Sequence, residues 1–232
     1  MKFDPIRKQS SLVILGDFNP NVFHPEWFCK NSIISPEEAD LAKSDTQKTP
    51  LIITPQLTMF STSQFSIRVE TNRFTVVCEK EPIVTMVDFI LKTFEKLGGI
   101  PIKAYGINYS AHYACDSLEE YQKVGDNLAP KSFWDHLLGD EVTGENRKSG
   151  LSRIQMIKYK QNEAGHILMT LEPSNLVKTG IYIACNNHTV VPDEDNFAES
   201  VVMQIGDSFS PEIQSMQTLQ EGLLERAIKQ ND

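Results

Sequence analysis

FSIRVETNRFTVVC, residues 65–78, is the stretch of the chain that decides its fold. Apolar and polar residues alternate on both sides of Glu70–Arg73, and the pattern predicts a β-hairpin with a tight turn. A helix-period apolar stripe follows over 83–97, and a second extended run covers 102–113. A hairpin, a connecting helix and a returning strand predict an architecture of mixed sheet and helix.

The second half of the chain repeats this pattern of elements. Extended runs are predicted over 151–160, 166–171 and 181–191, with a turn at 162–165. No sequence-level repeat between the halves accompanies the shared pattern. Because the strands come in hairpins and do not alternate strictly with helices, we predict an α+β fold. Its sheet is largely antiparallel and built from hairpins, with the helices packed on one face.

Two longer helical regions are expected. The helix over 82–97 is predicted to end with a left-handed residue at Gly98. Residues 197–205 fit a helix slightly better than a strand, and Gly206 would end it. Ser210-Pro211 then begins the last helix. Its inward residues are predicted to be Ile213, Met216, Leu219, Leu223, Leu224, Ala227 and Ile228.

The length of 232 residues suits one large domain or two small ones. We expect a single domain over 1–232. The alternative is a pair of sub-domains, 1–138 and 151–232, joined by the polar, glycine-containing loop 139–150. The sequence leaves open whether residues 1–50 belong to the main sheet or pack on it.

The charge and composition exclude several classes of protein. A net charge of −9 without a strong basic patch makes nucleic acid an unfavourable partner. The chain has no apolar run of about 18 residues, so no membrane span is predicted. The N-terminal apolar run is too short for the core of a signal peptide. A reducing cytoplasm fits four cysteines spaced far apart, namely Cys29, Cys78, Cys115 and Cys185.

The familiar motifs of catalysis and metal binding are missing from the sequence. It contains no glycine-rich phosphate loop and no Gly-x-Ser-x-Gly elbow. His112, Cys115, Cys185 and His188 have the right count for tetrahedral zinc. However, strand alternation would point His112 and Cys115 to opposite faces. We therefore predict no metal and no cofactor, and we favour a protein that is not an enzyme.

Polar residues within the two long apolar strands form the candidate site. Alternation along 101–113 places every second side chain on the same face of the sheet. If strand 179–190 is a neighbour, the shared face is either water-facing or a surface for a ligand or partner. The residues of this candidate face are Asn108, Ser110, His112, Asn187 and His188.

Two hypotheses for function follow. The first is a non-enzymatic cytoplasmic protein that acts as an interaction or complex-forming subunit, through a protein partner or self-association at exposed sheet edges. Trp27 and Trp134 are its candidate interface anchors, with core packing as the alternative for both. The second hypothesis is a small-ligand-binding protein or hydrolase that uses the Asn/His-lined face of the sheet.

Overall fold

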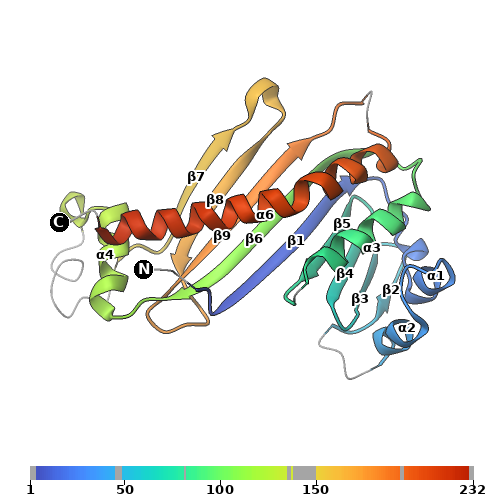
Figure 1. Ribbon diagram of the computed structural model, residues 1–232, viewed down its shortest axis with the longest axis horizontal. Coiled ribbons are helices and arrows are strands. Elements are labelled where there is room, and N and C mark those ends of the chain that lie inside the picture. The colour runs from blue at the N-terminus through green and yellow to red at the C-terminus, as the bar shows by residue number, and fades with distance from the viewer. Residues whose placement is uncertain are drawn as a thin grey trace.

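A single antiparallel sheet of nine strands forms the centre of the computed structural model, which describes residues 4–44, 49–80, 82–134, 137, 150–193 and 196–229. The strand order is β2-β3-β4-β5-β1-β6-β9-β8-β7 (Figure 1). The strands are β1 (Arg7–Gly16), β2 (Ile52–Ile53), β3 (Leu57–Ser61), β4 (Phe65–Glu70), β5 (Arg73–Cys78), β6 (Ile102–Ala114), β7 (Ile154–Tyr159), β8 (Gly165–Pro173) and β9 (Gly180–Val190).

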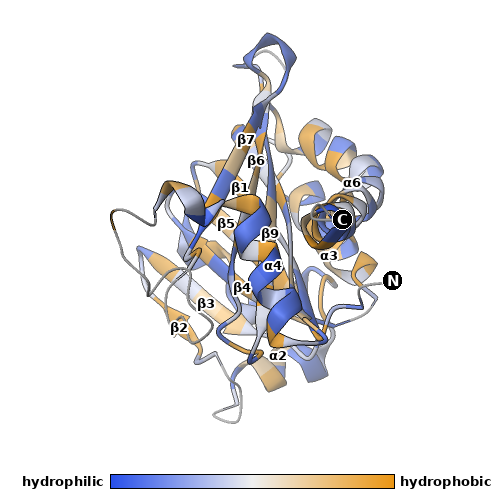
Figure 2. Cartoon of the chain, turned by 90° about the vertical axis from the view of Figure 1, so that its left-hand side faces the viewer, coloured by the Kyte–Doolittle hydropathy of each residue, from blue (hydrophilic) through white to orange (hydrophobic). Residues whose placement is uncertain are grey.

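The helices that the structure describes cover one face of this sheet, and Figure 2 shows α3 and α6 on the same side of it. They are α1 (Pro25–Lys30), α2 (Pro36–Ala42), α3 (Val84–Glu95), α4 (Leu118–Leu128) and α6 (Ala198–Lys229). Short 3-10 turns lie at Pro20–Val22, Lys131–Phe133 and Gln161–Glu163. The predicted α+β fold is therefore confirmed: an antiparallel sheet built from hairpins carries helices packed against it.

The hairpin of β4 and β5 forms where the sequence predicts it, with Glu70 opposite Arg73 at the turn. The apolar stripe of α3 packs on it: the Phe89 ring lies 4.7 Å from Phe65, and Phe94 lies 5.3 Å from Phe74. Burial of these aromatic rings stabilises the helix–sheet contact by about 2 kcal/mol or more for each side chain.

The predicted left-handed end of α3 at Gly98 is wrong. Gly165 is the glycine with a positive φ among the residues that the structure describes. At Gly98 a Cβ atom would lie 3.3 Å from the Cβ of Glu199, so glycine allows α6 to approach closely. Packing between helices, and not the backbone conformation, explains this glycine.

Of residues 1–50, the segment Arg7–Gly16 belongs to the main sheet as β1. β1 pairs with β5 on one side, from Ser10 to Leu15, and with β6 on the other, from Arg7 to Gly16. The segment that follows packs on the helix-covered face, where the buried ring of Phe28 lies 5.8 Å from Phe60 of β3.

The two halves of the chain share one topology. Each has a first strand (β1 or β6), one or more helices, three hairpin-linked strands (β3-β4-β5 or β7-β8-β9) and a closing helix (α3 or α6). In each half the first strand pairs with the last, and the two first strands pair antiparallel at the centre. This order implies an approximate two-fold axis perpendicular to the sheet between β1 and β6.

A boundary at 139–150 would not separate two sheets. β6 lies before that segment and β9 after it, yet they pair from Ala104–Val190 to Ala114–Gly180. The loop expected at 139–150 lies outside the described residues, apart from Gly150.

The helix expected to end at Gly206 continues without a break. α6 runs for 32 residues and holds Pro211 in its interior, so the predicted division at 206–210 is wrong. Proline removes one backbone hydrogen bond, but an apolar stripe that includes Val202, Ile205 and Phe209 stays buried along the helix. This tertiary burial outweighs the local cost. Gly206 faces Leu91 of α3, which a Cβ atom there would meet at 3.4 Å.

Candidate functional site: the open face of the sheet

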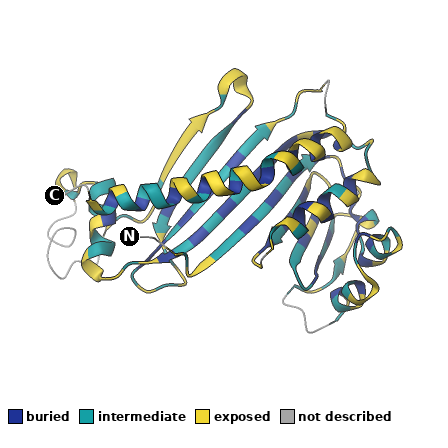
Figure 3. Ribbon diagram, in the orientation of Figure 1, coloured by how far each residue is buried: buried dark blue, intermediate teal, exposed yellow. Residues whose placement is uncertain are grey.

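No helix within the described residues covers the second face of the sheet, which we call the open face. Its side chains alternate with buried ones along each strand, and Figure 3 shows this alternation along β1, β6 and β9. Cross-strand pairing arranges the open-face residues in rows that run from strand to strand. Most of them are partly exposed.

One row crosses β1, β6, β9 and β8 through Arg7, His112, Tyr182 and Glu172. The ring centroids of His112 and Tyr182 are 4.6 Å apart, and His112 Nδ1 lies 2.8 Å from the Ser174 hydroxyl. Burial and the positive charge of Arg7 lower the pKa of His112, which favours the neutral ring.

These side chains line an open cavity of about 350 Å³, together with residues of β1 and the turn after β8. Arg7 donates two hydrogen bonds to Glu79, at 2.7 and 2.8 Å, and is already paired. Besides the charged Arg7, Lys8 and Glu172, the cavity offers hydroxyl, amide and imidazole groups. A cleft of about 520 Å³ lies on the other face, between α4 and β8.

The next two rows of the open face, counted from the row of His112, carry no charged side chain. One consists of Gln9, Ser110, Ala184, Thr170 and Gln155, taken across the strands in order. The other runs from Ser61 through Ser66, Val77, Ser11, Asn108, Asn186 and Leu168 to Ile157. We call these two rows the neutral band.

Asn108 is held by its neighbours within this band. Its Nδ2 donates to the Ser11 hydroxyl at 3.1 Å, and its Oδ1 accepts a hydrogen bond from Asn186 Nδ2. Gly106 leaves room for this network, because a Cβ atom there would lie 3.3 Å from Asn186 Nδ2. The amides thus form a pre-ordered polar surface.

A fourth row lies on the side of the neutral band away from His112. It consists of Val13, Gly106, His188, His166 and Tyr159. The rings of His166 and His188 lie 5.0 Å apart, and Tyr159 lies 6.2 Å from His166. Burial lowers the pKa of His188, with smaller contributions from His166 and Lys160.

Of the five candidate face residues, Asn108, Ser110, His112 and His188 lie on the open face, whereas Asn187 does not. Neighbouring residues of a strand point to opposite sides, so Asn187 turns to the helices and donates to Glu212 Oε2 at 2.7 Å. Burial raises the pKa of Glu212 there.

His112 and His188 do not share one pocket. His112 is opposite Tyr182, whereas His188 is opposite Gly106, six positions before His112 in β6. Six residues of a strand span about 20 Å. A ligand pocket that uses both histidines is therefore not formed, although the strands that carry them are neighbours.

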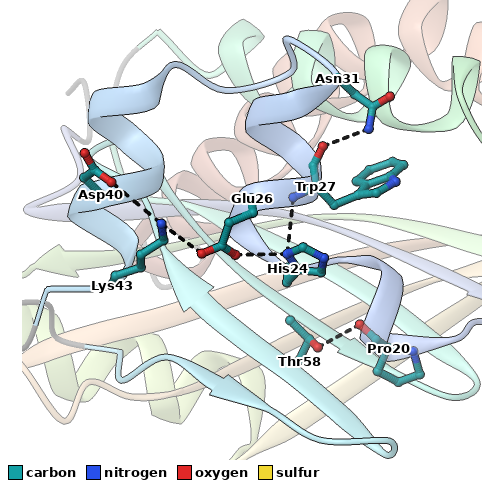
Figure 4. Close-up of polar contacts among 8 residues, drawn as sticks. All are labelled: Pro20, His24, Glu26, Trp27, Asn31, Asp40, Lys43 and Thr58. Atoms are coloured by element: carbon teal, nitrogen blue, oxygen red, sulfur yellow. Dashed lines mark hydrogen bonds and ion pairs between the residues drawn. The ribbon is translucent and has the colours of Figure 1, made fainter.

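The two tryptophans have different surroundings. Trp27 packs against the core, with its ring 5.1 Å from Phe28 and 6.0 Å from Phe23. Figure 4 shows its backbone carbonyl accepting a hydrogen bond from Asn31. Trp134 is 49% exposed. Trp134 is therefore the more accessible of the two.

An ion pair joins α1 to α2 beside Trp27 (Figure 4). Lys43 Nζ lies 2.8 Å from Glu26 Oε1, and this contact is the largest reason that the pKa of Glu26 falls to about 2. His24 Nδ1 lies 3.0 Å from Glu26 Oε2 and 3.2 Å from the amide nitrogen of Trp27. These contacts fix the two short helices in place.

Cys115 and Cys185 are not placed for nucleophilic chemistry or zinc binding. Burial raises the pKa of the Cys115 thiol to about 11 and also raises that of Cys185, so both are protonated at neutral pH. Cys185 lies under α6, whereas His112 and His188 lie on the open face. Within the described ranges no group of three or more His, Cys, Asp or Glu residues could hold a metal ion.

Comparison with known proteins adds no family. Neither the models of known protein families nor the curated proteins match this sequence. Among the helices that the structure describes, none has the combined length and apolar character needed to cross a membrane.

Proposed function

We propose that this protein is a non-enzymatic subunit that binds a partner protein on the open face of its sheet. The observation that carries the proposal is the neutral band. A sheet face turned to water usually carries charged and long polar side chains. The neutral band instead consists of serine and threonine, side-chain amides, one alanine and three larger apolar residues, and none of them is charged.

Protein interfaces share the low charge of this surface. Their centres are depleted of charged residues, and aromatic residues and arginine are enriched. Tyr182 and Arg7 border the neutral band on one side, and Arg68 lies in the row on its other side. Several acidic residues lie on the helices, such as Glu37 and Glu38 of α2 and Glu119 and Glu120 of α4, and Glu172 of β8 lies in the row beside the band. Four free cysteines support the cytoplasm as the proposed compartment.

The test is affinity purification from the protein's own cells with quantitative mass spectrometry. Ala184→Arg places a long cation in the neutral band, and Gln214→Arg places the same side chain on the exposed surface of α6. We expect one partner protein in near-equal amount with the wild type and Gln214→Arg, and a loss of at least tenfold with Ala184→Arg. Equal recovery from all three, or no such partner, would overturn the proposal.

A second candidate function is the binding of a small polar ligand in the His112 cavity. Its volume of about 350 Å³ falls at the lower end of ligand sites. A thermal-shift panel of nucleotides, sugars and organic acids tests it. A ligand at about 100 times its dissociation constant adds about 2.7 kcal/mol of stability. That shift should disappear in His112→Ala, and a panel without any shift removes this candidate.

A further inference from the structure

Strand β7 ends the sheet with an edge to which no described residue adds a strand. It pairs with β8 from Ile154 to Tyr159, and it has no other partner in the strand order. Its large side chains are exposed: Met156 by 68%, Ile157 by 46% and Tyr159 by 72%. Figure 3 shows the strand as largely exposed along its length.

The opposite edge of the sheet is protected. β2 has two residues, Ile52 and Ile53, and prolines at 50 and 55 flank it. Short edge strands and prolines are the usual means of preventing edge-to-edge pairing. A single charged residue, Lys158, lies within β7. The β2 edge is therefore protected against further strand pairing, whereas the β7 edge is not.

The approximate two-fold symmetry of the fold defines where a further strand would lie beside β7. β7 occupies in the second half the position that β3 occupies in the first. β3 has an outer neighbour, because β2 pairs antiparallel with it at Met59 and Thr58. The equivalent outer position beside β7 is empty of described strands.

We propose that a second copy of this chain occupies that position, so that two β7 strands pair antiparallel and two sheets join into one. The inference rests on the proposed function in treating the protein as a complex-forming subunit, but it uses the backbone edge of β7 and not the side chains of the neutral band. An isologous contact closes as a dimer. Pairing β7 with the two-residue β2 edge would leave most of its length unpaired.

The sequence of β7 permits such a pairing. Opposed residues of an antiparallel pair lie on the same face of the sheet. A two-fold axis perpendicular to the sheet keeps each residue on its own face. Two opposed residues are therefore both even-numbered or both odd-numbered. With Met156 opposite its own copy, Ile154 faces Lys158, and Gln155 faces Ile157. Arg153 then faces Tyr159, where a cation–π contact is available. No like charges are opposed in this register, whereas a register centred on Lys158 would oppose two lysines.

The first test is sedimentation velocity of the full chain at rising concentration. A six-residue pairing is small for a stable interface, so we expect dissociation on the order of micromolar. The mass should approach twice 26.2 kDa. Met156→Lys should weaken the dimer at least tenfold, because it opposes two lysines. Met203→Lys is the matched control, since Met203 of α6 is 62% exposed and away from the sheet.

A second measurement identifies the register. Met156→Cys should form a disulfide-linked dimer under mild oxidation, whereas Met203→Cys and the wild type should not. A monomer at every concentration overturns the inference, and so does a dimer that Met156→Lys and Met203→Lys weaken equally. The proposed function fails separately: its partner is lost with Ala184→Arg, a substitution on β9. The Met156 variants should still bind that partner, because Met156 lies in a row of the helix-covered face with Met169 and Cys185.

Discussion

At the scale of single residues, Gln220 shows how a polar side chain orders an apolar core. It is fully buried on α6 and donates to the carbonyl oxygens of Tyr109 and Ile183 at 3.3 Å, one on β6 and one on β9. Its Oε1 accepts the Tyr113 hydroxyl at 2.9 Å. These bonds hold α6 in one register across the two long strands, because any sliding would leave several buried groups unpaired.

Replacement of Gln220 by leucine should destabilise the protein by about 1–3 kcal/mol, because the buried Tyr113 hydroxyl loses its acceptor. Tyr113→Phe alone should cost about 0.5–1.5 kcal/mol. Urea denaturation of both single variants and the double variant gives the coupling energy. Costs that simply add would show that the two side chains do not interact.

The histidines of the open face predict a dependence of stability on pH. Burial lowers the pKa of His112 and of His188 in the folded protein, so the unfolded chain binds more protons in acid. Stability from these groups is therefore present above their unfolded pKa of about 6.5 and is lost as the pH falls through it. The double variant His112→Gln/His188→Gln should lose less stability than the wild type between pH 7.5 and 5.5. Parallel urea curves at the two pH values check this, and equal losses would contradict it.

At the scale of elements, β8 depends on a single glycine. Gly165 has a φ of 124°, and a Cβ atom there would lie 2.1 Å from the His188 carbonyl oxygen. This residue starts β8 directly opposite Thr189 of β9. Both the backbone conformation and the close approach of β9 require glycine at this position.

Gly165→Ala should destabilise the protein by about 2 kcal/mol or more, because the strained φ and the backbone clash both have to be relieved. Gly99→Ala is the matched control, since a Cβ atom at Gly99 meets nothing within 4 Å. Chemical denaturation of the two variants measures the difference. A cost at Gly165 no larger than at Gly99 would show that β8 adjusts without strain.

At the scale of the whole molecule, the pairing of β1 with β6 and the packing of α3 on α6 join the two halves. Both contacts are lost if either half unfolds, which leaves the buried faces of the other half in water. We therefore expect one cooperative transition, as the prediction of a single domain over 1–232 requires.

Each half contains one tryptophan, Trp27 in the first and Trp134 in the second. The variants Trp27→Phe and Trp134→Phe leave a single fluorescent reporter in either half. Their urea transitions should coincide with each other and with the far-ultraviolet circular dichroism within about 0.2 M, a small part of an ordinary transition. Two separated midpoints would instead show that the two topological halves unfold independently.

The candidate site could be predicted in part. The shared face of Asn108, Ser110 and His112 follows from alternation along one strand, which is a local property. Their neighbours Tyr182 and Asn186 come from β9, so they depend on strand pairing that the sequence does not encode locally. Gln220 was missed because the apolar pattern assigns Leu219 to the core, whereas Leu219 is 45% exposed.

The sequence by itself determined the local elements, namely the β4–β5 hairpin, α3 and the long strand β6, because hydrophobic period and turn residues act over short distances. Tertiary structure alone decided the strand order, the central place of β1 and the continuity of α6 through Pro211. It also decided that His188 faces the open side whereas Asn187 faces the helices. These features depend on burial between segments far apart in the chain, and that free energy outweighs local preferences.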